Sequence, residues 1–334
     1  MQFLLPTGIG DSVWALHKIE AIRDKIDPGG EINVALVGSS NEIDSRALDF
    51  ARRFKFISSA VMKPFSIHRQ GDWIKPDGTY NYMEDGLYQF GGEQYCVLVP
   101  NAPLEHGIRL EEWLPQYPIK WDIWKDFRIT PGECASSYDL VAQQPYCVFY
   151  PGPLHGNTTD GHNRNALWKP EDWAALGRRI YDEFGLQIVV VGAPYDATYY
   201  KWMLEPLLKN DREFWHNLIG QTNLGQLWSV TGGAKFVISY QAGVGIVSTY
   251  LGTPTAIFWR PYGDSISPQW FLSFDERMAS AWVPPATIEA GKHLPLIYGR
   301  HGIQHIVSEI RRRGWADAKV TAASAVTPEH WGES

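Results

Sequence analysis

The chain has 334 residues, of which 44% are hydrophobic and 20% are charged. This composition excludes a disordered chain, and the length suits two α/β domains of roughly 150 residues each. The 30 basic and 37 acidic residues give a net charge of −7, which disfavours a broad basic surface for nucleic acid or anionic lipid. No apolar stretch approaches the roughly 18–20 residues of a membrane span.

Strands and helices are predicted to alternate along both halves of the chain. In the first half we expect strands at 2–5, 32–37 and 95–99, helices at 13–26 and 45–54, an irregular segment at 62–94, and an approach to a linker at 107–138. In the second half we expect strands at 146–150, 187–191, 217–219, 236–239 and 255–259, and helices at 170–184, 197–208, 224–230, 244–251 and 301–313. Strand–helix–strand alternation predicts parallel sheets.

The expected fold class is therefore α/β, with two doubly wound Rossmann-like domains in series. We place the first domain at residues 1–142, the second at 143–319, and a mobile tail at 320–334. Ligands usually bind in the cleft between two such domains.

Three cysteines, Cys96, Cys134 and Cys147, are odd in number and far apart, without a CxxC pair. We expect buried thiols in a reducing compartment rather than disulfides.

The N-terminus has no basic region before its short apolar run, which argues against a signal peptide. The expectation is a cytoplasmic protein, with peripheral attachment to a membrane left open. Most of the 15 tryptophans are expected to pack cores.

A glycine loop, Gly8-Ile9-Gly10, follows the first predicted strand and precedes a helix. It matches only part of the dinucleotide fingerprint GxGxxG, because the third glycine position is Val13, so NAD or FAD binding loses its main support. The loop brings Asp11 to a helix N-terminus. This carboxylate either caps the helix, as Ser12 also could, or acts as a general base, and spacing alone leaves both interpretations open.

Several further motifs follow in order along the chain. They are Tyr150-Pro151-Gly152, Leu167-Trp168-Lys169-Pro170-Glu171-Asp172-Trp173, Val189-Val190-Val191-Gly192, Asn217 through Leu224, and Phe236 through Phe258. Together with Gly8-Ile9-Gly10-Asp11, this series resembles glycosyltransferase family 9, the ADP-heptose:lipopolysaccharide heptosyltransferases and their relatives. The resemblance covers about residues 1–40 and 146–260, and it implies the GT-B fold.

The resemblance also implies an enzyme and a division of roles. Asp11 would be the base that deprotonates an acceptor hydroxyl, in a loop with Gly8, Ile9, Gly10 and Ser12. The second domain would bind a nucleotide-sugar donor, and our candidate donor-binding residues are Gly152, Arg164, Lys169, Gln241, Ala242, Gly243 and Arg260. Transfer would invert the anomeric carbon, and the acceptor would be a saccharide or glycolipid. No two aspartates are separated by a single residue, so the DxD metal motif is missing, and we expect neither a metal nor a cofactor beyond the co-substrate.

Two departures from the family leave the donor's base and sugar open. The family's donor loop D-[ST]-G-x-x-H corresponds here to residues 241–246, where Gln241 replaces the Asp and Ile246 replaces the His. The family's Lys two residues before the Trp is Ala166, and Lys169 or Arg164 would have to supply that charge.

Three alternatives remain. A transferase acting on a modified base in DNA would need a basic track, for which Lys55, Lys63, His68, Arg69 and Lys75 are the candidates. A non-catalytic sugar-nucleotide binding module would explain the altered donor loop, although Asp11 argues for catalysis. A sugar-nucleotide epimerase of the same fold would convert the donor without an acceptor.

Overall fold

The computed structural model describes residues 1–37, 42–63, 88–90, 93–98, 100, 103–104, 107–141, 144–152, 168–259, 276–297 and 301–317. The chain divides into two compact units, Met1–Arg128 and Ile129–Ser334, which we call the N-terminal and C-terminal units. The division comes before the expected boundary at 142/143, because α4 (Pro131–Leu140) belongs to the C-terminal unit. There Ser137 Oγ donates to the carbonyl oxygen of Gln226 at 3.3 Å. The expected tail, 320–334, lies outside the described residues.

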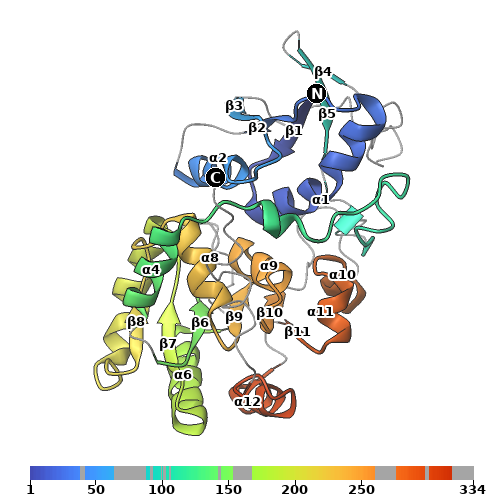
Figure 1. Cartoon of the computed structure of the whole chain (residues 1–334). Coiled ribbons are helices and arrows are strands. Elements are labelled where there is room, and N and C mark those ends of the chain that lie inside the picture. Colours follow the sequence, from blue (N-terminus) through green and yellow to red (C-terminus); the bar gives the residue numbers. More distant parts are fainter. Residues whose placement is uncertain are drawn as a thin grey trace, which may run out of the picture. The chain divides into compact units, whose positions relative to one another are not determined.

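The N-terminal unit contains a five-stranded sheet in the order β3-β2-β1-β5-β4 (Figure 1). Its strands are β1 (Gln2–Pro6), β2 (Asn33–Val37), β3 (Ser59–Lys63), β4 (Tyr88–Phe90) and β5 (Glu93–Val97). β3, β2, β1 and β5 are parallel, and β4 pairs antiparallel with β5. Phe3, Leu4 and Leu5 of β1 are fully buried, as expected for a central strand of a covered parallel sheet.

The helical elements of this unit are α1 (Ile9–Ile26), α2 (Glu42–Arg52) and the short 3-10 helix η3 (Ile123–Asp126). α1 is buried along most of its length, including two titratable side chains. Lys18 Nζ donates to the carbonyl oxygens of Leu114 at 3.3 Å and Tyr117 at 2.9 Å. His17 Nδ1 lies 2.6 Å from the carbonyl oxygen of Lys120. These contacts attach the segment 114–120 to α1, and Leu114 is held there with a left-handed φ of 50°.

Burial changes the ionisation of both side chains. Desolvation lowers the pKa of His17 to about 4, with nearby Lys18 adding to the effect. Desolvation likewise lowers the pKa of Lys18 to about 8. His17 is therefore a neutral structural side chain at pH 7.

The C-terminal unit contains a six-stranded sheet in the order β11-β10-β9-β6-β7-β8, with all neighbouring strands parallel (Figure 1). Its strands are β6 (Tyr146–Tyr150), β7 (Gln187–Val190), β8 (Trp215–Asn217), β9 (Val237–Tyr240), β10 (Thr255–Trp259) and β11 (His293–Ile297). Numbered from β6, this is the 3-2-1-4-5-6 order of a Rossmann fold. The predicted α/β class with parallel sheets is confirmed.

The described helices of the C-terminal unit begin with α4. They continue with α6 (Pro170–Phe184), α8 (Leu224–Gly232), α9 (Gly243–Tyr250), α10 (Glu276–Ala281), α11 (Pro285–Glu289) and α12 (Ile303–Arg312). Between β7 and β8 lie the short turns η4 (Pro194–Asp196), α7 (Ala197–Tyr199), η5 (Tyr200–Leu204) and η6 (Glu205–Leu208). Pro170 occupies the predicted first turn of α6, and Gly185 ends the helix with a φ of 67°, as the asymmetry of helix ends favours.

Opposite faces of the C-terminal sheet are covered by α6 and α9. The Oγ of Ser239 lies 2.9 Å from the Cβ position of Gly245 on α9. The next residue, Tyr240, accepts a hydrogen bond from Trp173 on α6 at 3.1 Å. Because successive strand residues point to opposite faces, the two helices lie on the two sides of β9.

The structure differs from the predicted elements in several places. β3 and β11 were not predicted, β8 begins before the expected strand at 217, and β4 falls within the segment expected to be irregular. The expected single helix at 197–208 is divided into α, π and 3-10 turns. Pro206 lacks the amide hydrogen that a continuous helix would use.

Candidate active site

The turn between β1 and α1 lies at the carboxyl edge of the N-terminal sheet. Gly8 is the N-cap of α1, and Ile9, Gly10 and Asp11 form its first turn. The chain runs from β1 outward to β2 and β3, then crosses to the other side of β1 to form β5. Ligands of open α/β sheets bind at the carboxyl ends of strands where the order reverses in this way. The predicted acceptor loop occupies that position in the N-terminal unit.

Asp11 and Ser12 have different surroundings in this turn. Ser12 is buried, its Oγ donates to the carbonyl oxygen of Pro6 at 2.9 Å, and its amide donates to Gly8 at 2.8 Å. It therefore anchors the turn to β1 through its side chain. Asp11 is half-buried, and its carboxylate lies over Gly8, where a Cβ would collide with Oδ2. Glycine at position 8 leaves room for a carboxylate at the positive end of the helix dipole.

The predicted donor residues follow β6 and β9, at the point where the strand order of the C-terminal sheet reverses. β6 and β9 are neighbours, with Tyr150 paired to Ser239. Gly152 is the second residue after β6, while Gln241 and Ala242 connect β9 to α9. The structure therefore brings Gly152 and the β9–α9 turn to one edge of one sheet. This edge is the expected ligand position of a Rossmann domain.

The beginning of α9 is suited to an anion. Its N-cap, Ala242, provides no side-chain cap, and the first turn contains no acidic residue. The amide of Gln241 donates to the carbonyl oxygen of Phe258 at 3.0 Å, which fixes the turn to β10. Residues 241–243 are half-buried. Because the first amide groups of a helix lack intrahelical acceptors, such an end binds phosphate or carboxylate.

Of the other described helices that follow strands at this edge, α8 has a side-chain cap, whereas α6 and α12 have none. Asn223 caps α8, accepting from the amide of Gln226 at 2.9 Å, and Gln226 returns a bond to the Asn223 amide at 2.9 Å. Asp172, in the first turn of α6, accepts from the amide of the N-cap residue Lys169 at 2.7 Å. The Lys169 side chain is exposed and forms no ion pair with another residue in the described part of the chain. Its charge is available to a ligand.

Asp196 is a buried carboxylate at this edge that the sequence analysis did not identify. Its Oδ2 accepts from the amide of Ala193 at 2.9 Å and lies 3.4 Å from the hydroxyl oxygen of Tyr150. Its Oδ1 lies 2.9 Å from the Cβ position of Gly152. Asp196 thus connects the ends of β6 and β7. The signal that could have identified it is an acidic residue in the loop directly after a buried strand.

Two predicted donor residues, Arg164 and Arg260, lie outside the described residues, as do His68, Arg69 and Lys75 of the expected basic track. Lys55 of that track is exposed. Ile246, which replaces the family's histidine, is 2% exposed within α9. Its side chain belongs to the core rather than to the ligand edge.

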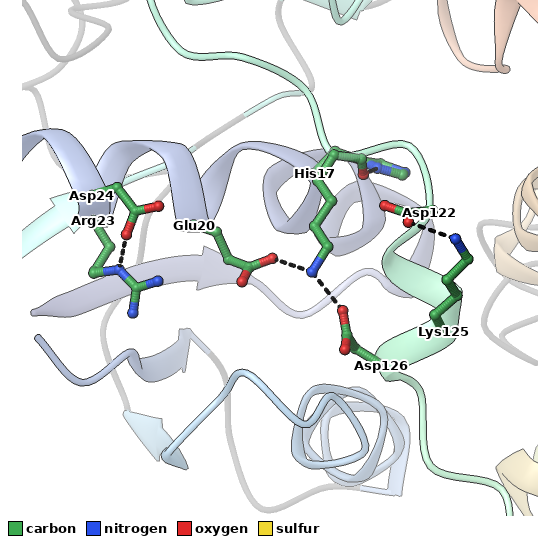
Figure 2. Close-up of polar contacts among 8 residues, drawn as sticks. His17, Glu20, Arg23, Asp24, Asp122, Lys125 and Asp126 are labelled. Atoms are coloured by element: carbon green, nitrogen blue, oxygen red, sulfur yellow. Dashed lines mark hydrogen bonds and ion pairs between the residues drawn. The ribbon is translucent and has the colours of Figure 1, made fainter. Parts of the chain in front are cut away.

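A second polar cluster lies further along α1. Lys120 Nζ is 2.8 Å from Glu20 Oε2 and 2.6 Å from Asp126 Oδ2, and Figure 2 shows both carboxylates converging on this ammonium group. A groove of about 530 Å³ lies beside it, between α1 and residues 116–120. Glu20 is roughly 13 Å from Asp11 along the helix axis. This groove is therefore separate from the β1–α1 turn, and two of its lining charges, Glu20 and Lys120, are paired with one another.

The described residues give no support for a metal site or a membrane-spanning helix. They contain no group of three or more metal-ligating side chains. None of the helices described there is long and apolar enough to cross a membrane. The three cysteines are buried and unbridged, as predicted, and burial raises the pKa of Cys96 and Cys147.

Comparison with known proteins identifies related sequences over part of the chain. A family model described as Glycosyltransferase family 9 (heptosyltransferase) matches residues 114–265. Lipopolysaccharide heptosyltransferase 2 of Escherichia coli K12 is 24% identical over 179 residues, which are 53% of this chain and 47% of the relative. The protein of the same name from Salmonella typhimurium LT2 gives the same identity and coverage. The chain thus spans about half the length of the curated relatives it matches.

Solved structures are similar over nearly the whole chain. The E. coli ADP-heptose lps heptosyltransferase II has a TM-score of 0.58 at 16% identity, over 93% of this chain and 97% of that one. A glycosyl transferase family 9 protein from Veillonella parvula has a TM-score of 0.56 at 11% identity, over 95% and 97%. The resemblance to glycosyltransferase family 9 is confirmed over residues 114–265, and the chain has the GT-B fold of two Rossmann-like domains.

Proposed function

We propose that this chain is a glycosyltransferase that moves a sugar from a nucleotide-sugar donor to the hydroxyl of a saccharide or glycolipid acceptor. The observation that carries the proposal is the position of Gly152 and the β9–α9 turn at the strand-order reversal of a Rossmann sheet. That turn ends in a helix N-terminus with neither a side-chain cap nor an acidic first turn. A nucleoside diphosphate provides the anion that such an end binds.

In the proposed reaction Asp11 removes the proton of the acceptor hydroxyl. The acceptor oxygen forms a bond to the anomeric carbon while the bond from that carbon to the diphosphate breaks. The diphosphate leaves with the electron pair, and a single displacement inverts the anomeric carbon. Asp11 lies in the first turn of α1 with its carboxylate over Gly8. A half-buried carboxylate at the carboxyl edge of a sheet supports the role of general base.

The developing negative charge on the leaving group would be stabilised without a metal. The amide groups at the beginning of α9 and the ammonium group of Lys169 are the described groups that support this role. Gln241 would contribute hydrogen bonds where the family has a carboxylate. Arg164 and Arg260 remain proposed donor ligands on the basis of the sequence.

The first experiment is a thermal-shift screen of ADP, GDP, UDP, CDP and dTDP and their sugar forms. ADP-heptose comes first because the curated relatives are named heptosyltransferases. A ligand at about 100 times its dissociation constant adds about 2.7 kcal/mol to the free energy of unfolding, which raises the melting temperature clearly. A hit is then tested for sugar transfer to saccharide and glycolipid acceptors. The absence of any nucleotide hit would contradict the proposal.

A second candidate function is a sugar-nucleotide binding module without catalysis. It is favoured by the burial of Ile246 and the neutral Gln241 at the two altered positions. Such a module would bind the same nucleotides but neither hydrolyse nor transfer the sugar, with or without acceptor. Product formation that depends on Asp11 would exclude it.

A further inference from the structure

Four aromatic side chains pack together between the beginning of α6 and strands β9 and β10. Trp168 and Trp173 lie on either side of the Lys169 N-cap, while Tyr240 and Phe258 are cross-strand partners on β9 and β10. Ring centroids are 5.4 Å apart for Trp168 and Trp173, 5.3 Å for Trp173 and Tyr240, and 4.6 Å for Trp168 and Phe258. All four are at most 3% exposed. The cluster is a rigid connection between α6 and the two strands.

The Tyr240 hydroxyl is the polar group inside this cluster. Trp173 Nε1 donates to it at 3.1 Å, and it donates to the carbonyl oxygen of Trp168 at 3.3 Å. One hydroxyl thereby satisfies a buried indole donor and a buried backbone acceptor. Buried polar groups of this kind hold their partners in one arrangement, because any other leaves them unpaired.

The two hydrogen-bond partners of Tyr240, Trp168 and Trp173, lie before and after Lys169 in the sequence. Trp168 directly precedes Lys169, and Trp173 lies in the first turns of α6. On the strand side, Tyr240 ends β9 and is followed by Gln241, whose amide is bonded to Phe258. The hydroxyl therefore connects the backbone that carries Lys169 to the turn that begins α9.

We infer that Tyr240 is a positioning residue for the donor diphosphate. It fixes the backbone that carries Lys169 relative to the N-terminus of α9, so that the Lys169 ammonium and this helix end can act on the same anion. This inference rests on the proposed nucleotide-sugar site and identifies a residue that acts through Lys169 rather than by contact with the ligand. Small displacements of such groups are costly, because binding and transfer depend on their alignment.

The chain offers a matched control in Tyr146, at the opposite end of the same sheet. Tyr146 begins β6, is buried, and its hydroxyl donates to the carbonyl oxygen of Val230 at 2.7 Å. Tyr146→Phe removes one buried hydroxyl, as Tyr240→Phe does, but far from Lys169 and α9. Melting temperatures of the two variants measure any general loss of stability.

The test is calorimetric titration of ADP, GDP, UDP, CDP and dTDP into the unmodified full chain and into the variants. For the nucleotide that binds, Tyr240→Phe is expected to raise the dissociation constant about tenfold, and Tyr146→Phe less than twofold. Equal effects of the two variants would overturn the inference while leaving the proposed function in place. Failure of every nucleotide to bind the unmodified chain would overturn both.

A double-mutant cycle with Lys169→Ala separates positioning from a general structural role. If Tyr240 acts through Lys169, Tyr240→Phe should weaken binding by less than twofold in the Lys169→Ala background, although it does so about tenfold in the unmodified chain. Additive effects would overturn the inference. The cycle is read from binding alone and does not depend on an acceptor.

Discussion

The two units contain the same local motif, a buried strand followed by a glycine-containing turn and a helix, beside the point where the strand order of each sheet reverses. In the N-terminal unit the first turn of α1 contains a carboxylate, Asp11. In the C-terminal unit the first turn of α9 contains none, and its N-cap is Ala242. One positive helix end thus has an anion of the protein beside it, and the other has no acidic residue in its first turn.

This difference shows how one motif can serve opposite roles in a transfer reaction. A carboxylate at a helix N-terminus is held in its charged form by the dipole and repels a second anion. An uncapped N-terminus attracts a phosphate group. In the proposed reaction, the charge on the first turn favours the base in the N-terminal unit and the diphosphate in the C-terminal unit.

The largest expected effect comes from neutralising the charged turn. Asp11→Asn should lower kcat by about 10²–10⁴-fold, because it removes general-base catalysis, and should leave the nucleotide dissociation constant within about twofold. The matched control is Asp24→Asn, an exposed acidic residue on the same helix that pairs with Arg23. Steady-state kinetics and titration of the two variants test this. If the Asp11→Asn variant keeps its activity, Asp11 is not the general base.

The next largest effect is a loss of stability in acid that comes from α1 and not from α9. Burial holds the pKa of His17 on α1 at about 4, against 6.5 in an unfolded chain. The unfolded state takes up this proton first, so stability is complete above pH 6.5 and falls as the pH approaches 4. Lys18 lowers this pKa further, and Asp122 raises it. From about pH 7.5 to about pH 4.5 the loss should be about 2 kcal/mol.

Urea unfolding at the two pH values measures this loss. His17→Gln should remove that part of the pH dependence, while α9 contains no group that titrates in this range. An identical pH dependence in the unmodified chain and the variant would assign the acid sensitivity to other groups.

An acidic N-cap on α9 should weaken nucleotide binding. Ala242→Asp places a carboxylate at the N-cap of α9, which should raise the nucleotide dissociation constant about tenfold through charge repulsion. Ala242→Asn is the isosteric control and should have a smaller effect on binding. Both variants should melt no lower than the unmodified chain, because Asp and Asn are better N-caps than Ala. A loss of affinity of equal size in both would point to steric blocking rather than charge.

The smallest expected effect tests the room above Gly8. Gly8→Ala would push the Asp11 carboxylate from its position, because a Cβ there collides with Oδ2. The side chain is flexible at that end, so the free energy of unfolding should fall by only about 1 kcal/mol. We expect kcat to fall several-fold without loss of nucleotide binding. Unchanged kcat would show that this orientation of the carboxylate is not the active one.

The sequence predicted the repeated strand–helix units well, because their apolar periodicity is local. It did not predict β11, whose segment contains Pro295 and has two half-buried positions. It also missed β3, where the exposed Val61 interrupts the buried pattern of a parallel strand. These two edge strands are specified by their neighbours in the sheet rather than by their own composition.

The positions of Gly8–Asp11, Gly152 and Gln241–Gly243 at the sheet edges were predictable, because each motif follows a strand, and their roles stay predictions. Asp196 and Tyr240 could not be found in that way, because their partners Gly152, Tyr150 and Trp168 are distant in the sequence. Most tryptophans were predicted to pack cores, as Trp168 and Trp173 do, and the structure adds the Tyr240 hydroxyl that connects these two. Such contacts depend on strand order, which periodicity does not determine.

The strand order also affects how the proposed donor edge, the carboxyl edge of the C-terminal sheet at Gly152 and the β9–α9 turn, forms during folding. β6 pairs with β9 through Val148 and Val237, which are separated by β7, β8 and their helices. A contact of such long sequence separation forms late, because the loop closure must precede it. A truncated or partly synthesised chain that lacks β9 would have no complete donor edge. Nucleotide binding would therefore report that the C-terminal unit has folded through β9.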